Sequence, residues 1–219
     1  MASGKSEKPK RSGTAKGRDL DQRILEVTLA QADEVGWDQV RLRRVAEGLG
    51  ITLPELRSHY RDLDAVADAW FERALDAMLA HTEAGFADLP ARERIYLVMI
   101  RWFEAQRHER AVVGQMLATK LYPSHPHHWV PMIFRLSRLI QWVRDAAGLD
   151  AGGKRRQVEE VGLTLLFLAA LRVWLGDETD DLEITRRFLR RRLSEADTLL
   201  ANLPRPRRPR DRRPAAKTA

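Results

Sequence analysis

Arginines and short polar side chains gather between residues 41 and 61, where they could bind a polyanion. The arginines of this stretch are Arg41, Arg43, Arg44, Arg57 and Arg61. A guanidinium group donates hydrogen bonds in pairs to phosphate oxygens or to the edge of a guanine base. Ser58 and His59 lie between two of the arginines and add further donors and acceptors. This stretch therefore indicates recognition of a nucleic acid backbone and of base edges.

Two short helices joined by a glycine turn are expected to position these side chains. A preceding helix is predicted over residues 19–35 by the apolar stripe Ile24, Leu25, Thr28, Leu29 and Ala32. Gly36 ends it, a second helix follows over residues 41–48, and Gly50 allows a sharp turn. Thr52 then caps a third helix that runs to about Tyr60.

The third helix has the pattern of a helix that enters the DNA major groove. Its spacing predicts that Leu53, Leu56 and Tyr60 face inward. The outward residues would then be Glu55, Arg57, Ser58 and His59. A packing helix, a glycine turn and a polar reading helix are typical of the helix-turn-helix motif. Asp62 is expected to cap a long fourth helix that follows this unit.

Residues 24–71 resemble the TetR family of regulators. The residues that carry the resemblance are Gly36, Val45-Ala46, Leu49-Gly50-Ile51-Thr52, Leu56, His59-Tyr60 and Asp62-Leu63-Asp64. The resemblance implies an all-α fold with an N-terminal three-helix helix-turn-helix head and a C-terminal helical bundle. It also implies a ligand-responsive regulator, a repressor rather than an enzyme, that binds operator DNA as a homodimer. Thr52, Pro54, Glu55 and Tyr60 would join the arginines, Ser58 and His59 in binding double-stranded DNA.

Three departures from the family pattern leave an alternative open. Arg41 stands where the family usually has a capping threonine, Arg57 where it has a tyrosine, and Leu63 where it has a lysine. Residues 19–66 carry six arginines and ten carboxylates, so the head is acidic. The alternative is a lipid- or isoprenoid-binding accessory protein whose head is only a folding unit, as in the ubiquinone-biosynthesis protein with this fold.

Helices of the predicted body are expected near residues 91–107, 109–120, 130–147, 155–176 and 181–202. Residues 158–176 are apolar nearly all round, so this helix must be covered on both faces. In the resembling family the last two long helices pair across a two-fold axis. The resemblance therefore implies an interface that includes Val161, Leu165, Leu168, Arg172, Phe188 and Leu189. A central helix of a monomer is the alternative.

A ligand pocket is implied by the same resemblance. The candidates for its lining are Trp102, Phe103, Met116, Trp129, Met132, Phe134 and Trp142. Such a lining would favour a small hydrophobic or aromatic molecule. Aromatic and methionine residues at helical spacing also form ordinary cores, and pockets and cores share this composition, so both interpretations stay open.

The net charge of +7 comes from the two ends of the chain. Residues 1–18 carry +5 and residues 204–219 carry +6, which leaves residues 19–203 at −4. Both ends are predicted to be disordered basic arms, either solubilising or attracted to phosphate. The expected domains are therefore a DNA-binding unit over 19–62 and a ligand-binding and dimerisation unit over 63–203.

Other functional classes find little support in the composition. The chain has no cysteine, which excludes thiol chemistry and fits a reducing cytoplasm. His125, His127 and His128 invite a metal interpretation, but no cysteine or nearby carboxylate completes a ligand set, so an exposed loop is the preferred interpretation. No apolar stretch is long enough for a membrane span, no catalytic motif is present, and we expect no cofactor.

Overall fold

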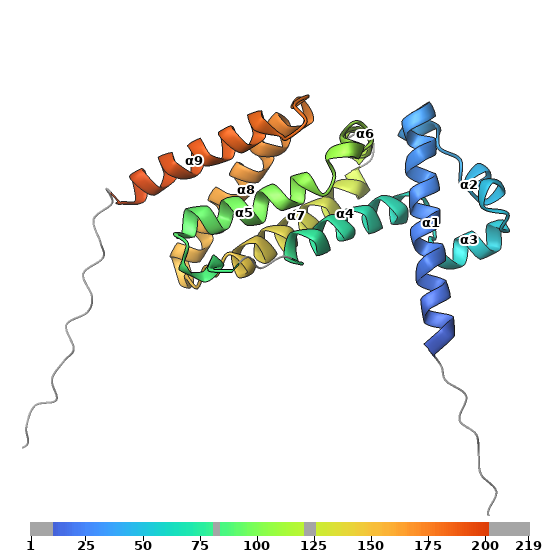
Figure 1. Cartoon of the computed structure of the whole chain (residues 1–219), viewed down its shortest axis with the longest axis horizontal. Coiled ribbons are helices and arrows are strands. Elements are labelled where there is room, and N and C mark those ends of the chain that lie inside the picture. Colours follow the sequence, from blue (N-terminus) through green and yellow to red (C-terminus); the bar gives the residue numbers. More distant parts are fainter. Residues whose placement is uncertain (1–10, 81–83, 121–125, 202–219) are drawn as a thin grey trace, which may run out of the picture.

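The computed structural model describes residues 11–80, 84–120 and 126–201, with side chains over 17–80, 84–120 and 133–197. Within these residues the chain forms nine α-helices, three 3-10 turns and no strand. The predicted all-α fold is therefore confirmed. Figure 1 shows α1, α2 and α3 together at one end of an elongated molecule. None of the described helices is long and apolar enough to cross a membrane.

The head consists of α1 (Arg11–Val35), α2 (Leu42–Leu49) and α3 (Leu53–His59). The predicted apolar stripe of α1 is buried, and it packs against Trp37, Val45, Ala46 and Leu56. The prediction of a disordered arm over residues 1–18 is wrong from residue 11 onward. The first helix begins at Arg11, because residues 11–18 contain no proline or other strong helix breaker apart from two glycines. Residues 1–10 lie outside the described part.

The body contains the remaining six helices, which are α4 (Leu63–Leu79), α5 (Ala91–Glu104), α6 (Arg110–Lys120), α7 (Pro126–Ala146), α8 (Gly153–Leu175) and α9 (Glu183–Ala201). In Figure 1, α4 leaves the head and packs against α5, and α9 lies on the other side of α5; α8 packs against both α7 and α9. Most boundaries agree with those expected to within about three residues. The predicted basic tail over 204–219 lies outside the described residues.

Aromatic rings from α4, α5 and α8 fill the centre of the body. Trp102 stacks with Phe71 and meets the edge of Phe167, at ring-centroid separations of 6.4 and 5.0 Å. Phe103 stacks on Phe167 at 5.4 Å and contacts Trp174 at 5.7 Å. Such pairs contribute about 0.5–1.5 kcal/mol each beyond their burial. This aromatic core fixes α8 against α5, and hence fixes which face of α8 is left outward.

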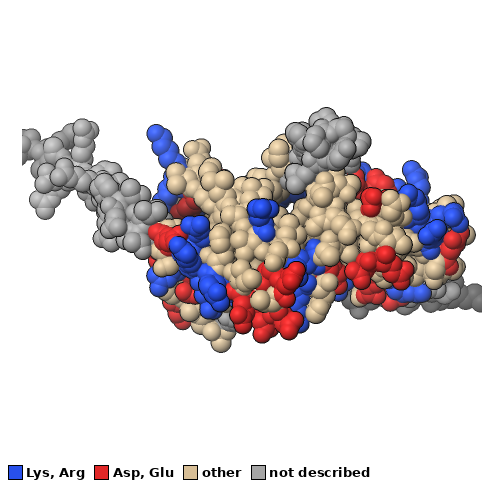
Figure 2. Space-filling view, turned by 90° about the horizontal axis from the view of Figure 1, so that it is seen from above, with Lys and Arg blue, Asp and Glu red and all other residues tan. Residues whose placement is uncertain are grey.

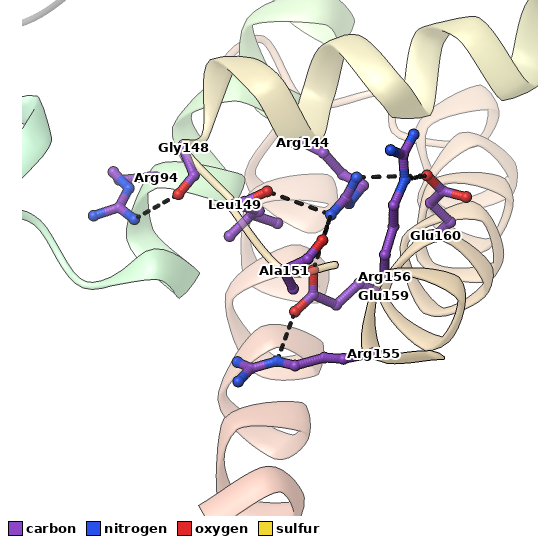
Figure 3. A network of polar contacts seen from close by, with 9 residues as sticks. All are labelled: Arg94, Arg144, Gly148, Leu149, Ala151, Arg155, Arg156, Glu159 and Glu160. Carbon is purple, nitrogen blue, oxygen red and sulfur yellow. Dashed lines mark hydrogen bonds and ion pairs between the residues drawn. The ribbon is translucent and has the colours of Figure 1, made fainter. Parts of the chain in front are cut away.

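A buried arginine joins the end of α7 to the beginning of α8 (Figure 3). The Arg144 guanidinium donates to the backbone oxygens of Leu149 and Ala151 at 3.3 and 3.0 Å. It also pairs with the carboxylates of Glu159 and Glu160 at 3.3 and 3.4 Å. Because a guanidinium group has five donors, one side chain can hold both the loop and the first turns of the next helix. Arg144 thereby sets where α8 begins.

The turn between α8 and α9 is organised by Asp177, which is fully buried. One carboxylate oxygen accepts hydrogen bonds from the backbone N–H and hydroxyl of Thr185, at 2.8 and 2.7 Å. The other accepts from the backbone N–H and hydroxyl of Thr179. Burial of the carboxylate opposes ionisation, but these four hydrogen bonds hold the pKa of Asp177 below its usual value. The side chain of Asp177 is therefore ionised in the folded protein.

Candidate nucleic-acid interface

Local capping defines the short helix α3, as the sequence predicts. The Thr52 hydroxyl accepts a hydrogen bond from the Glu55 N–H at 3.2 Å, and Pro54 lies in the first turn. Leu56 is buried beneath the helix. The Asp62 carboxylate accepts from the Ala65 N–H at 2.7 Å and begins α4. These caps give α3 a defined start and end on the surface of the head.

Two residues predicted to contact DNA are instead directed at α1. Nδ1 of His59 lies 2.6 Å from a carboxylate oxygen of Asp21, and the ring is mostly buried. The hydroxyl of Tyr60 donates to the Asp21 carbonyl at 3.2 Å. Burial and, secondarily, the Asp21 charge raise the pKa of Tyr60 above its usual value, so it stays a donor. The outward orientation expected for His59 is therefore wrong, because α1 supplies a carboxylate within reach.

Among the candidate arginines, Arg44 and Arg57 are exposed, and their side chains make no ion pair or hydrogen bond with any described residue. Arg43 pairs with Glu47 one turn along α2. Arg61 pairs with Asp62 at 2.9 Å. The guanidinium of Arg41 donates to the carbonyls of Asp38 and Val40 at 2.9 and 3.0 Å. Of the five candidate arginines, Arg44 and Arg57 are therefore the ones that can bind a new partner without breaking a side-chain contact to a described residue.

The outer side of α3 contains a hollow with mostly apolar walls. Pro54, Glu55, Arg57 and Ser58 are exposed, as predicted. Leu53 is 47% exposed, so its predicted inward position is wrong. Leu53 is the first residue of α3, where no preceding turn of the helix covers it. The hollow is lined by Leu42, Leu53, Pro54, Leu56, Arg57, Ser58, Tyr60 and Arg61.

The head contacts the body chiefly through α6. The backbone N–H of Trp37 donates to the side-chain oxygen of Gln115 at 2.6 Å. Within the body, Nζ of Lys120 ties α6 to α4, the helix that follows the head, and lies 3.2 Å from Asp64 and 3.4 Å from Asp68. Arg135 on α7 also pairs with Asp68. Sequence reasoning missed this junction, because its partners are separated by more than fifty residues.

The described side chains among the predicted pocket residues lie in two different environments. Trp102, Phe103 and Met116 are buried, and the first two belong to the aromatic core. Phe134 and Trp142 are wrong as lining of an enclosed pocket, because they are 60% and 46% exposed on the outer side of α7. The side chains of Trp129 and Met132 lie outside the described residues. Neither the hollow on the head nor a groove beside α9, lined mainly by arginines, includes any of these residues.

The residues predicted for the dimer interface divide between two environments. Val161, Leu165, Leu168 and Arg172 are exposed along one side of α8. Phe188 is half-buried, but Leu189 is fully buried inside its own chain, so its assignment to an interface is wrong. Leu189 faces inward because α9 packs on both α5 and α8. Sequence reasoning missed two exposed apolar residues that the 3-4 spacing could have found, Val158 and Leu175.

The histidine group falls outside the described side chains. His125 precedes the described part of α7, and only the backbone is described for His127 and His128. Among the side chains that are described, no group of three or more potential metal ligands is found.

Solved structures share this architecture, and two of them are compared with this chain. The first, a TetR transcriptional regulator from Nitrosomonas europaea, is 36% identical, with a TM-score of 0.74. The match covers 82% of this chain and 99% of that one. The second, a TetR transcriptional regulator from Rhodococcus sp. RHA1, is 18% identical, with a TM-score of 0.57, over 87% of this chain and 100% of that one; at this identity it shows the fold alone. No family model and no curated protein matches the sequence.

Proposed function

Because the chain belongs to the TetR family of transcriptional regulators, we propose that it binds double-stranded operator DNA as a homodimer and responds to a small ligand. In this proposal residues 19–62 bind DNA, and residues 63–203 form the dimer and hold the ligand. The observation that best supports DNA binding is that the side chains of Arg44 and Arg57 are exposed and unpaired. Each can reach a phosphate or a guanine without giving up an existing contact.

Because the head carries a net negative charge, its binding to DNA depends on the position of Arg44 and Arg57. Residues 19–66 have a net charge of −4, so the head as a whole repels DNA. Four of the carboxylates are engaged with basic groups or caps: Asp21 with His59, Glu47 with Arg43, and Asp62 and Asp64 at the start of α4. Arg44 and Arg57 are therefore the expected main phosphate contacts of the folded head.

An exposed apolar stripe on α8 supports the homodimer. Val158, Val161, Leu165, Leu168 and Leu175 recur at intervals of three, four and seven residues, and Ile184 on α9 is also exposed. Figure 2, seen from above the view of Figure 1, shows uncharged residues over much of the middle of the molecule, with charges toward the ends and one edge. A continuous apolar stripe on a monomer marks an interaction surface. A second copy presenting the same stripe would cover it by two-fold symmetry.

Gly162 gives a second reason to expect a partner on this side of α8. It lies inside the helix, where glycine costs about 1 kcal/mol relative to alanine. A Cβ atom added at this position would meet no described atom of the same chain within 4 Å. Packing against the described atoms of the same chain therefore does not require a glycine at position 162. Close approach of a partner helix, beside the exposed Val161 and Leu165, accounts for it.

Ligand response would act through the junction between head and body. Three buried polar atoms of the body have no hydrogen-bond partner among the described residues: Nε1 of Trp174 in the aromatic core, Nε1 of Trp70 on α4 and Oε1 of Gln106 after α5. Buried polar groups usually make hydrogen bonds, so these atoms favour a flat apolar ligand with a polar group. Its binding would separate packed rings and move α6. Gln115 would transmit the movement to the head through Trp37, and Lys120 would transmit it to α4. In a repressor this movement would lower operator affinity.

The proposal is tested by selecting duplexes from a random pool with the full chain. We expect enrichment of a two-fold symmetric site with half-sites about one helical turn apart or a multiple of it. A variant with Arg44→Ala and Arg57→Ala provides the matched control and should enrich nothing, although circular dichroism should show the same helix content. If the unaltered chain enriches no sequence at moderate salt, the DNA-binding proposal is wrong.

A further inference from the structure

Leu53 is a large apolar residue exposed on the most polar part of the head. It is 47% exposed and lies between Thr52, whose hydroxyl is used as a cap, and the exposed Pro54. Nothing inside the chain requires leucine here, because the core beneath α3 is closed by Leu56 and Tyr60. Leu53 therefore adds uncovered apolar surface to the helix that is proposed to face DNA.

The hollow beside Leu53 is lined by both apolar and basic side chains. Leu42, Leu53 and Pro54 supply carbon surface, and Arg57 and Arg61 belong to the same lining. Apolar surfaces that bind proteins are usually much larger than one such hollow. The arginines instead suit a polyanion that carries an apolar group. Double-stranded DNA is such a partner, because the 5-methyl group of thymine is the apolar group exposed in the major groove.

We propose that Leu53, together with Pro54, reads thymine in the operator by receiving its 5-methyl group in this hollow. The inference rests on the proposed function and adds to it a feature of the operator: a thymine at a fixed position in each half-site. Arg57 would contact a phosphate or a neighbouring base and hold α3 in register, while Leu53 supplies the discrimination. A base without the methyl group would leave the apolar wall facing water.

The test uses the operator selected with the full chain and removes one methyl group at a time. Each thymine is replaced by deoxyuridine, which keeps every hydrogen-bonding group, and the dissociation constant is measured by fluorescence anisotropy at fixed salt. Burial of one methyl group predicts that affinity falls about fourfold at one position of each half-site. With Leu53→Ala the same replacement should change affinity by less than about 1.5-fold, since the methyl group then has no wall to contact.

A matched control is Val35→Ala, which shortens another exposed apolar side chain of the head away from the hollow. This variant should keep the full sensitivity to deoxyuridine. If the unaltered chain binds its operator equally well with every thymine replaced, or if Leu53→Ala keeps the sensitivity, the thymine contact is wrong while DNA binding stands. If no operator is enriched at all, both the inference and the proposed function are wrong.

Discussion

The side-chain oxygen of Gln115 accepts a hydrogen bond from the backbone N–H of Trp37, across 2.6 Å and 78 positions of sequence. Gln115 belongs to α6 of the body, and Trp37 begins the turn that follows α1 in the head. Trp37 is itself buried, so its amide has few other partners. This single contact ties the orientation of the head to the position of α6.

Replacing Gln115 with alanine should loosen the head without unfolding it. Loss of the acceptor leaves the Trp37 N–H without its partner, which should lower the free energy of unfolding by about 1 kcal/mol. Urea unfolding followed by circular dichroism measures this change. Gln141→Ala is the matched control, because Gln141 is exposed on α7 and contacts no described side chain by hydrogen bonding. Equal stability of the two variants would contradict the proposed coupling.

Arg57→Ala should weaken operator binding without affecting the fold. A bidentate contact to guanine predicts a loss of about 1–3 kcal/mol and relaxed specificity at one base pair. A phosphate contact instead predicts an equal loss on all sequences and a salt dependence shallower by about one unit. Arg138→Ala removes a charge of the same kind from α7 of the body and should change neither quantity. Unchanged affinity for Arg57→Ala would rule out this residue as a DNA contact.

The double variant Leu165→Glu and Leu168→Glu should convert the dimer to a folded monomer. Both side chains are exposed in the single chain, Leu165 by 63%, so the new charges stay in water there. Between two protomers they would be buried without partners, and the dissociation constant of the dimer should rise at least about 100-fold. Light scattering measures the mass. Val35→Glu, an equivalent change on the head, is expected to leave the dimer intact.

The variant Gly162→Ala tests whether a partner helix approaches α8 closely at this position. Alanine should favour α8 itself by about 1 kcal/mol. If a partner helix approaches at Gly162, the added methyl group should nevertheless weaken association, as measured by sedimentation. Gly48→Ala is the control, since its Cβ would meet Val27 at an ordinary 3.8 Å. A more stable dimer after Gly162→Ala would show that no partner approaches closely at this residue.

Asp177→Asn should destabilise the protein at neutral pH and reduce its sensitivity to acid. The carboxylate accepts four hydrogen bonds, and an amide cannot accept all of them, so we expect a loss of about 2–3 kcal/mol. The folded state lowers the pKa of Asp177. Its contribution to stability is therefore complete above the unfolded pKa of about 3.9 and is lost as the pH falls through the lower, folded pKa.

Urea unfolding between pH 7 and pH 2 measures this effect. The unaltered chain should lose more stability below about pH 4 than the Asp177→Asn variant does. Asp180→Asn changes an exposed carboxylate of the same turn and should follow the unaltered chain. Parallel curves for the unaltered chain and Asp177→Asn would show that the buried carboxylate does not govern the acid response.

The sequence by itself determined the helices, their caps and the class of fold. Thr52 and Asp62 cap α3 and α4 as predicted, because a capping hydrogen bond joins residues only three positions apart. The buried stripe of α1 followed from periodicity alone. The exposed residues of α8 also follow the same 3-4 spacing, although the spacing could not tell which of its apolar sides would be covered.

The tertiary structure alone decided which of these side chains meet a partner. Leu53 and Leu56 share an inward prediction, yet only Leu56 is buried, because no neighbouring helix covers the first residue of α3. His59 was expected to contact DNA, but its ring instead pairs with Asp21, which lies 38 positions away in the sequence. Burial and pairing depend on elements that are distant along the chain, so local spacing carries no information about them.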